Sequence, residues 1–239
     1  MAPNAFADIA RNRAADEPVY SELQEVYPPL LPGWHRRSLA AGRIQLSLYW
    51  GPAKNGVQSL LNQMGPGQRE PVDLWLLDGF APDRNPEMWA EDLLADIGRT
   101  AGADTRVSTF TSAGRVRRGL IAAGFDARRV NQRPRKWESL AGTYTGRGRP
   151  RTNGPDQVTV VGAGIAGATA ARALAEAGLE VSVLEAADQP AAGASRIPAT
   201  VMHPRLHHDG SNLANLKATA YAHALAATRA FADMEGTGV

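Results

Sequence analysis

The stretch that decides the fold runs from residue 157 to residue 185 and reads QVTVVGAGIAGATAARALAEAGLEVSVLE. The apolar run at 158–161 predicts a strand, residues 165–177 predict a helix, and residues 181–184 predict a second strand. Gly178 follows the helix, where a glycine readily takes the left-handed conformation that ends helices. The order strand, helix, strand predicts a βαβ unit with parallel strands.

The glycines between the first strand and the helix follow the GxGxxG spacing of dinucleotide-binding units, at Gly162, Gly164 and Gly167. The first allows a tight turn, the second lets the backbone approach a pyrophosphate, and the third lets helix and strand pack closely. Ile165 begins the helix, whose N-terminal N–H groups attract a diphosphate. Glu185 lies eighteen residues after Gly167, where a carboxylate accepts hydrogen bonds from ribose hydroxyls and repels a 2′-phosphate. The alternative is a glycine-rich turn without a ligand, followed by a solvated glutamate.

A second α/β pattern precedes this unit. VDLWLL at 72–77 is a continuous apolar run, which is typical of strands buried on both faces of a parallel sheet. Further strands are predicted at 105–110, 125–131 and 139–144, with helices at 85–100 and 113–123, and this alternation favours a parallel or mixed sheet covered by helices. Earlier in the chain, the sequence predicts two helical pieces over 4–27, a hairpin around Ala41-Gly42 and a helix over 56–64.

The segment TGRGRPRTNGPD at 145–156 is rich in Gly, Pro and Arg and is expected to be a linker. The predicted organisation is therefore one α/β domain over residues 1–144, the linker, and a dinucleotide-binding domain over residues 157–239.

Composition narrows the class of protein. The 239 residues include no cysteine, which excludes disulfides, thiolate metal sites and cysteine nucleophiles. No apolar run reaches the ~18 residues that cross a membrane, and the acidic N-terminus does not read as a signal peptide. We expect a soluble cytoplasmic protein.

The charge is unevenly distributed, although the net charge is only +2. Eleven Lys and Arg residues lie between residues 115 and 151, against two acidic residues. The positive electrostatic potential of such a basic stretch attracts polyanions, and binding of this kind is sensitive to salt. The simpler alternative is a solvated helix face followed by a basic linker. The candidate nucleic-acid contacts are Arg115, Arg117, Arg118, Arg133, Arg135 and Lys136.

The strand at 72–77 ends in Asp78-Gly79-Phe80, within the string LLDGFAPDRNPEMW of residues 76–89. Ligands bind at the carboxyl edge of open α/β sheets, so Asp78 is a candidate for holding an amine and assisting its deprotonation. A turn or helix-capping aspartate is the competing interpretation.

His203, His207, His208 and Asp209 suggest a metal site, but Pro204 breaks any helix that would align them, so we expect no metal.

The strings LDGFAPDRNPEMW and TFTSAGRVRRGLIAAGF (109–125), followed by the glycine turn and Gly193-Ala194-Ser195, resemble one family in the same order. It is the bifunctional tRNA 5-methylaminomethyl-2-thiouridine biosynthesis (MnmC-type) family. The resemblance implies the C-terminal part of a Rossmann-like methyltransferase domain, followed by the first βαβ unit of an FAD-binding domain of the D-amino-acid-oxidase type. The segment PAAGASRIPATVMHPRL, which contains Gly193-Ala194-Ser195, also resembles the loop after the second strand in flavoproteins of the glycine and D-amino-acid oxidase type. This resemblance favours FAD over NAD, and the family resemblance adds Ser195 to the FAD-binding residues.

The family acts on uridine 34 of certain tRNAs. The resemblance implies FAD-dependent removal of carboxymethyl from 5-carboxymethylaminomethyluridine, and S-adenosylmethionine-dependent methylation of the resulting amine. Asp78 would orient the amine, and Phe80 would pack at the substrate.

The sequence lacks a glycine-rich S-adenosylmethionine loop before Val72, and it carries Arg196 where the family usually has glycine. Both domains are expected to be incomplete, with exposed sheet edges and weak or no turnover by this chain alone. Two alternatives remain open, namely an FAD-dependent amine or amino-acid oxidase of small molecules, and a non-catalytic protein that binds nucleotide or tRNA.

Overall fold

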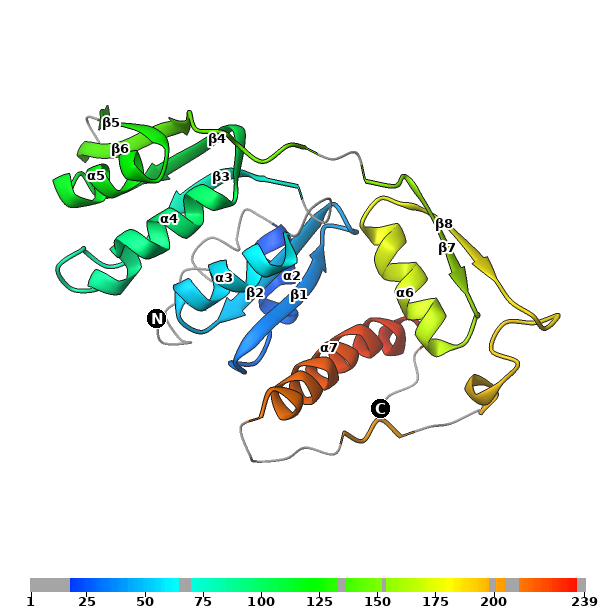
Figure 1. Cartoon of the computed structure of the whole chain (residues 1–239). Helices are drawn as coiled ribbons and strands as arrows, with labels where there is room; N and C mark the ends of the chain where they lie inside the picture. Colours follow the sequence, from blue (N-terminus) through cyan, green and yellow to red (C-terminus); the bar gives the residue numbers. More distant parts are fainter. Residues whose placement is uncertain are drawn as a thin grey trace. The chain divides into compact units, whose positions relative to one another are not determined.

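The computed structural model describes residues 18–64, 70–132, 136–151, 154–197, 201–204 and 211–235. Backbone contacts divide the chain into two compact units, one of residues 51–153 and one that joins residues 1–50 to residues 154–239. Figure 1 labels their elements. Within the described ranges, no helix is long and apolar enough to cross a membrane.

The unit of residues 51–153 contains a four-stranded mixed sheet (Figure 1). Its strands lie in the order β3-β4-β6-β5, where β3 and β4 are parallel and β6 is antiparallel to both of its neighbours. Helix α4 connects β3 to β4, and helix α5 connects β4 to β5. The bounds are β3 Val72–Leu77, α4 Glu91–Arg99, β4 Ala101–Thr109, α5 Gly114–Ala122, β5 Phe125–Gln132 and β6 Lys136–Tyr144. This confirms the mixed α/β class.

The core of this unit forms where the helices meet alternate residues of the strands. In β4, Thr105 and Val107 are buried, whereas the intervening Arg106 is exposed. A Cβ added at Gly119 of α5 would lie 2.6 Å from Leu94 Cδ1 of α4, so the two helices pack closely because residue 119 is glycine. Each large apolar side chain buried here contributes about 1.5–3 kcal/mol.

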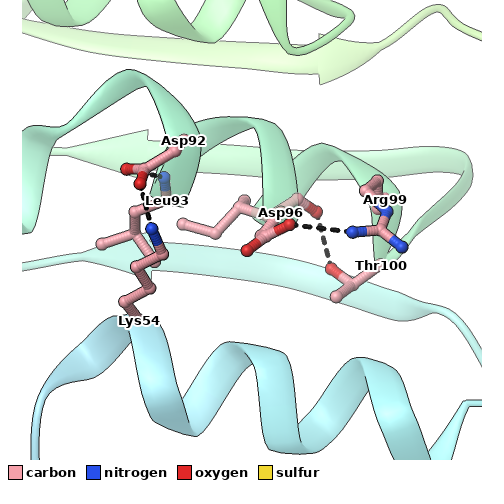
Figure 2. Close-up of polar contacts among 7 residues, drawn as sticks. Lys54, Asp92, Leu93, Asp96, Arg99 and Thr100 are labelled. Atoms are coloured by element: carbon pink, nitrogen blue, oxygen red, sulfur yellow. Dashed lines mark hydrogen bonds and ion pairs between the residues drawn. The ribbon is translucent and has the colours of Figure 1, made fainter.

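One polar contact joins helix α3 (Ala53–Gln63) to α4, as Figure 2 shows. Lys54 Nζ donates a hydrogen bond to the Asp92 carboxylate, and this bond raises the pKa of Lys54 and lowers the pKa of Asp92. Asp92 Oδ1 also accepts the Leu93 N–H at 2.7 Å. A carboxylate in the first turn of a helix offsets the partial positive charge there, so Asp92 stabilises the start of α4, whereas its exposed ion pair with Lys54 adds little to the contact between α3 and α4.

Strand β3 is an edge strand, and the prediction that it is buried on both faces is wrong. Leu74 is 44% exposed and Leu76 is 70% exposed, whereas Trp75 and Leu77 pack against the core. The helices cover the face of β3 that carries Trp75 and Leu77. No described residue buries the opposite face, which carries Leu74 and Leu76. In the sheet, β3 is hydrogen-bonded only to β4.

The single helix expected over residues 85–100 is two helices. A short 3-10 helix, η1 (Pro86–Trp89), ends at Ala90, whose φ of −65° and ψ of 143° are extended, and α4 begins at the next residue. Trp89 is 5% exposed, and its ring lies edge-on to that of Phe110 with the centroids 5.8 Å apart. The break lets both Trp89 and the apolar face of α4 reach the core.

Part of the segment expected to be a linker packs against this unit. We call residues 146–151 the docked segment. The Arg149 backbone N–H donates to Ala101 O at 2.8 Å, and its guanidinium donates to Met64 O. Arg151 forms an ion pair with Asp73. The contacts use the backbone and guanidinium groups instead of apolar side chains.

In the second unit, helix α2 (Pro18–Glu25) precedes a hairpin of β1 (Gly33–Leu39) and β2 (Ile44–Trp50). The hairpin confirms the prediction around Ala41-Gly42, while the predicted helix over residues 4–17 lies outside the described residues.

The βαβ motif of this unit consists of β7 (Gln157–Val161), α6 (Ile165–Glu176) and β8 (Glu180–Leu184), and its strands are parallel. A short 3-10 helix, η2 (Ala194–Arg196), and the long helix α7 (Asn212–Glu235) follow. The predicted motif is thus confirmed.

Candidate functional site

The turn from β7 into α6 has the backbone geometry that its glycines predict. Gly162 has φ +98°, in the left-handed region that favours glycine, and its N–H donates to Leu184 O at 2.7 Å. A Cβ added at Gly167 would lie 1.8 Å from Gly162 O. Only glycine at 167 therefore lets the first turn of the helix lie against the strand end.

Ser195 and Ile165, both predicted to contact the cofactor, meet at the start of α6. Ser195 Oγ accepts a hydrogen bond from the Ile165 N–H at 3.0 Å. A Cβ added at Gly164 would lie 3.2 Å from this Oγ, so the hydroxyl lies close to the turn. The first N–H groups of a helix have no partner inside it, and α6 has no acidic residue in its first turn. These features leave this helix end suited to an external anion.

Glu185 points back at the turn from the end of β8. Its Oε2 accepts the Ala163 N–H at 2.7 Å, and its Oε1 accepts the N–H groups of Ala186 at 2.8 Å and Ala187 at 3.2 Å. The hydrogen bond from Ala163, followed by those from Ala187 and Ala186, lowers the pKa of Glu185. Since the side chain is exposed, an ionised carboxylate faces solvent beside the helix N-terminus.

Together these groups fit the ADP half of FAD. Donor N–H groups at the start of α6 match a diphosphate, and the carboxylate beside them matches ribose hydroxyls. Gly162, Gly164 and Gly167 add no side chains of their own to the turn, and the side chains that reach its N–H groups are those of Ser195 and Glu185.

In the unit of residues 51–153, Asp78 and Phe80 lie at the carboxyl end of β3. Both side chains are exposed, Phe80 to 60%. Asp78 Oδ1 accepts the N–H of Gly79 at 2.9 Å, which directs the carboxylate into the loop. The arrangement allows Asp78 to accept a hydrogen bond from a ligand amine and leaves the Phe80 ring free to stack on a planar base.

The sequence alone assigned no role to Trp89, which contacts the loop that follows β3 from the side of the core. Its indole Nε1 donates to Phe80 O at 2.9 Å. The aromatic residue in NPEMW signals a buried anchor, but its hydrogen-bond partner lies nine residues earlier and follows only from the fold.

The basic stretch is partly neutralised within the unit. Arg115 pairs with Asp83 at 2.9 Å, and Arg128 pairs with Asp126 at 2.6 Å. Arg117 and Arg118 are exposed on α5, where no ion pair is recorded for either within the described part of the chain. Arg133, Arg135 and the side chain of Lys136 lie outside the described residues.

The described residues offer neither a metal cluster nor a turn that would fit a methyl donor. No cluster of three or more His, Cys, Asp or Glu side chains occurs among the described residues; these include His203 but not His207, His208 or Asp209. The described residues before β3 form α2, the hairpin and α3, and they offer no glycine-rich turn from a strand into a helix that would fit S-adenosylmethionine.

Comparisons with known proteins match both halves of the chain. A family model described as S-adenosyl-L-methionine-dependent methyltransferase matches residues 15–145, and one described as FAD dependent oxidoreductase matches residues 157–238.

The chain is similar to curated proteins named tRNA 5-methylaminomethyl-2-thiouridine biosynthesis bifunctional protein MnmC. It is 40% identical to that of Magnetococcus marinus over 92% of this chain and 32% of the relative. It is 37% identical to that of Thiobacillus denitrificans over 97% of this chain and 37% of the relative. The chain therefore spans about a third of the length of these relatives.

A crystal structure of MNMC2 from Aquifex aeolicus is 21% identical, with a TM-score of 0.42 over 56% of this chain and 38% of that one. The similarity to MnmC proteins inferred from the motifs is confirmed by the curated relatives. This chain belongs to the S-adenosyl-L-methionine-dependent methyltransferase family and continues into part of an FAD dependent oxidoreductase domain.

Proposed function

We propose that this protein takes part in modifying the wobble uridine of tRNA, by an FAD-dependent oxidation and a methyl transfer to the same side chain of the base. The observation that carries the proposal is that one chain holds both the 162–167 turn with Glu185 beside it and the exposed Asp78 at a separate sheet edge. The names of the curated relatives point to a 5-methylaminomethyl-2-thiouridine product.

When bound, FAD would supply the two-electron oxidation of the bond between the amine nitrogen and the carboxymethyl carbon, so that hydrolysis would release this unit as glyoxylate and leave the free amine. The residues of this chain hold the cofactor. The N–H groups at the start of α6 bind its diphosphate, and Glu185 accepts hydrogen bonds from its ribose. The Ser195 hydroxyl, which now accepts from Ile165, is close enough to the turn to join that binding surface.

In the methyl transfer, the nucleophile is the amine left by the oxidation. An amine must be neutral to attack a methyl group, so a carboxylate that accepts its proton and fixes its orientation favours the reaction. Asp78 supplies this carboxylate, and Phe80 supplies an exposed ring for the base. Since the described residues do not fit the methyl donor, no further step is assigned to them.

The tRNA would be held mainly through its phosphates. Arg117 and Arg118 lie on α5, which follows the strand next to β3 and begins near the same sheet edge as Asp78. Phosphate contacts fix the register of a nucleic acid without reading its sequence, so recognition of the base falls to Asp78 and Phe80. We place the reaction in the cytoplasm, with residues 1–144 and 157–239 as the two domains.

The main alternative is an oxidase of small amines or amino acids, which would share the FAD-binding turn. It gives no role to the exposed Asp78 and Phe80. A non-catalytic protein that binds nucleotide or tRNA would show binding without preference for the modified base.

The flavin half of the proposal is tested by titrating the purified chain with FAD and following the flavin absorbance bands. We expect the bands to shift and saturate, and NADP⁺ to compete poorly because Glu185 repels its 2′-phosphate. If the flavin bands do not shift even at a large excess of FAD, the proposed FAD-dependent oxidation by this chain is refuted.

The methyltransferase half is tested with anticodon stem–loop RNA that carries either 5-aminomethyluridine or uridine at the wobble position. The wild-type chain should prefer the amine-bearing RNA, Asp78→Asn should lose that preference, and Asp83→Asn, a control in the same loop, should keep it. Equal preference in all three proteins would show that Asp78 does not contact the amine.

A further inference from the structure

We infer that Trp89 is a positioning residue for the substrate loop, which we define as residues 78–85. The inference rests on the proposed function, because that function places the wobble base at Asp78 and Phe80. Trp89 itself is 5% exposed and does not reach the substrate side of the loop. Its indole Nε1 donates to Phe80 O at 2.9 Å, which fixes the peptide plane that follows Phe80.

The indole is a firm support because the core holds its ring. The ring lies edge-on to Phe110 at the end of β4, with the centroids 5.8 Å apart and the planes 70° apart. Just before Phe80, a Cβ added at Gly79 would lie 3.5 Å from Met88 Cε and 3.9 Å from the Trp89 ring. The backbone of the substrate loop therefore lies directly on η1.

The hydrogen bond also selects one conformation of the loop. A buried N–H group without a partner is unfavourable, so a loop that moved the Phe80 carbonyl away would leave the indole unsatisfied. With the carbonyl fixed, Asp78 and Phe80 keep the same orientation whether or not a substrate is present.

A second contact with the loop is weaker. Arg115 pairs with Asp83 at 2.9 Å, but their side chains are 46% and 94% exposed. Exposed ion pairs of this kind contribute little and are screened by salt. Pro82 is buried and the N–H groups of Arg84 and Asn85 donate to Ala81 O, so these contacts order the second half of the loop. The position of the Phe80 carbonyl is therefore the part of the loop that depends on Trp89.

The chain provides a matched control in Trp75. This tryptophan also packs against the core, and its Nε1 donates to Thr100 Oγ1 at 3.0 Å, away from the substrate loop. Trp75→Phe and Trp89→Phe therefore remove the same atoms and one indole hydrogen bond each. Only Trp89→Phe removes the bond that holds Phe80.

The test measures amide hydrogen exchange in the two variants. We expect exchange in the substrate loop to become about tenfold faster in Trp89→Phe and to stay unchanged in Trp75→Phe. Preference for the anticodon stem–loop with 5-aminomethyluridine over that with uridine should fall only in Trp89→Phe. Equal loop exchange in the two variants, or faster exchange with the preference retained, would overturn the inference.

Two further results keep this inference separate from the proposed function. If the wild-type chain does not prefer the amine-bearing RNA, the role of Asp78 fails, while loop exchange still decides whether Trp89 orders the loop.

If Trp89→Phe does not fold, the indole N–H protons of the wild-type chain decide whether Trp89 holds the loop. The Trp89 proton should exchange slowly and shift on addition of the RNA, with Trp75 as the internal reference. A Trp89 proton that exchanges freely or does not shift would refute the inference.

Discussion

Replacing Gly167 by alanine tests the geometry on which the proposed FAD binding depends. The added Cβ would lie 1.8 Å from Gly162 O and 3.0 Å from Gly162 C, whereas Cβ atoms essentially never approach another heavy atom closer than 3.0 Å. Either the turn or the first turn of α6 must therefore move by about 1 Å to admit one methyl group.

The cost follows from that displacement. Forcing an extra methyl group into a closely packed site costs about 1–3 kcal/mol. If the turn relaxes in the free protein, the bound state has to restore it, so the strain appears in the dissociation constant. Each ~1.4 kcal/mol is a factor of ten in affinity, and we expect Gly167→Ala to bind FAD at least about tenfold more weakly.

The assay is an FAD titration followed by flavin absorbance, with thermal unfolding measured in parallel. Gly178→Ala is the control, because Gly178 has φ +89° at the far end of α6 and open space around it. Alanine in the left-handed region costs roughly 1–2 kcal/mol, so the control should lower stability and leave FAD affinity unchanged. If Gly167→Ala binds FAD as tightly as the wild type, the close approach of helix and strand does not form the binding site.

Three other predictions concern charge, the core and the basic helix. The backbone hydrogen bonds that lower the pKa of Glu185 keep it ionised, so FAD affinity should be constant from neutral pH down through the usual carboxyl range. It should fall only as pH drops through the lowered pKa, and Glu185→Gln should remove this fall in the titration series. Leu94→Ala, at a side chain that is 1% exposed, should lower the free energy of unfolding by about 3–5 kcal/mol in denaturant melts, whereas Leu76→Ala, at 70% exposure, should change it by less than about 0.5 kcal/mol. Arg117→Glu should weaken tRNA binding and reduce its salt dependence by about one phosphate contact in filter-binding assays, and Arg36→Glu, in the other unit, should do neither.

The sequence predicts the parts of the structure that depend on local patterns. The hairpin, the βαβ motif and the left-handed Gly162 and Gly178 follow from periodicity and glycine placement. Glu185 also lies beside the turn, because the end of a parallel neighbouring strand brings it there. Its hydrogen bond with the Ala163 N–H follows from this strand pairing. The number of residues between the glycine turn and Glu185 was therefore enough to predict that the two lie close together.

Features that depend on distant partners were not predictable. The apolar run at β3 shows that its side chains are hydrophobic, but it cannot show which face is covered, so the exposure of Leu74 and Leu76 was missed. The break at Ala90 was missed because the apolar spacing continues across it.

The count of basic residues was similarly incomplete. It could not show that Arg128 pairs with Asp126, or that Arg149 binds the carbonyl of Met64. Charge patterns report composition along the chain, whereas ion pairing depends on which strands become neighbours.

The docked segment of residues 146–151 determines where a fragment that contains the four-stranded sheet can end. A Cβ added at Gly148 would lie 2.5 Å from Gly102 C, so the segment is seated backbone to backbone on the start of β4. A protein ended at Thr145 would lose this layer and leave the carbonyl of Met64 and the carboxylate of Asp73 without their arginines. A fragment that ends near Gly154 keeps the docked segment on the residues it covers, so any fragment that is to contain the four-stranded sheet should extend at least to Arg151.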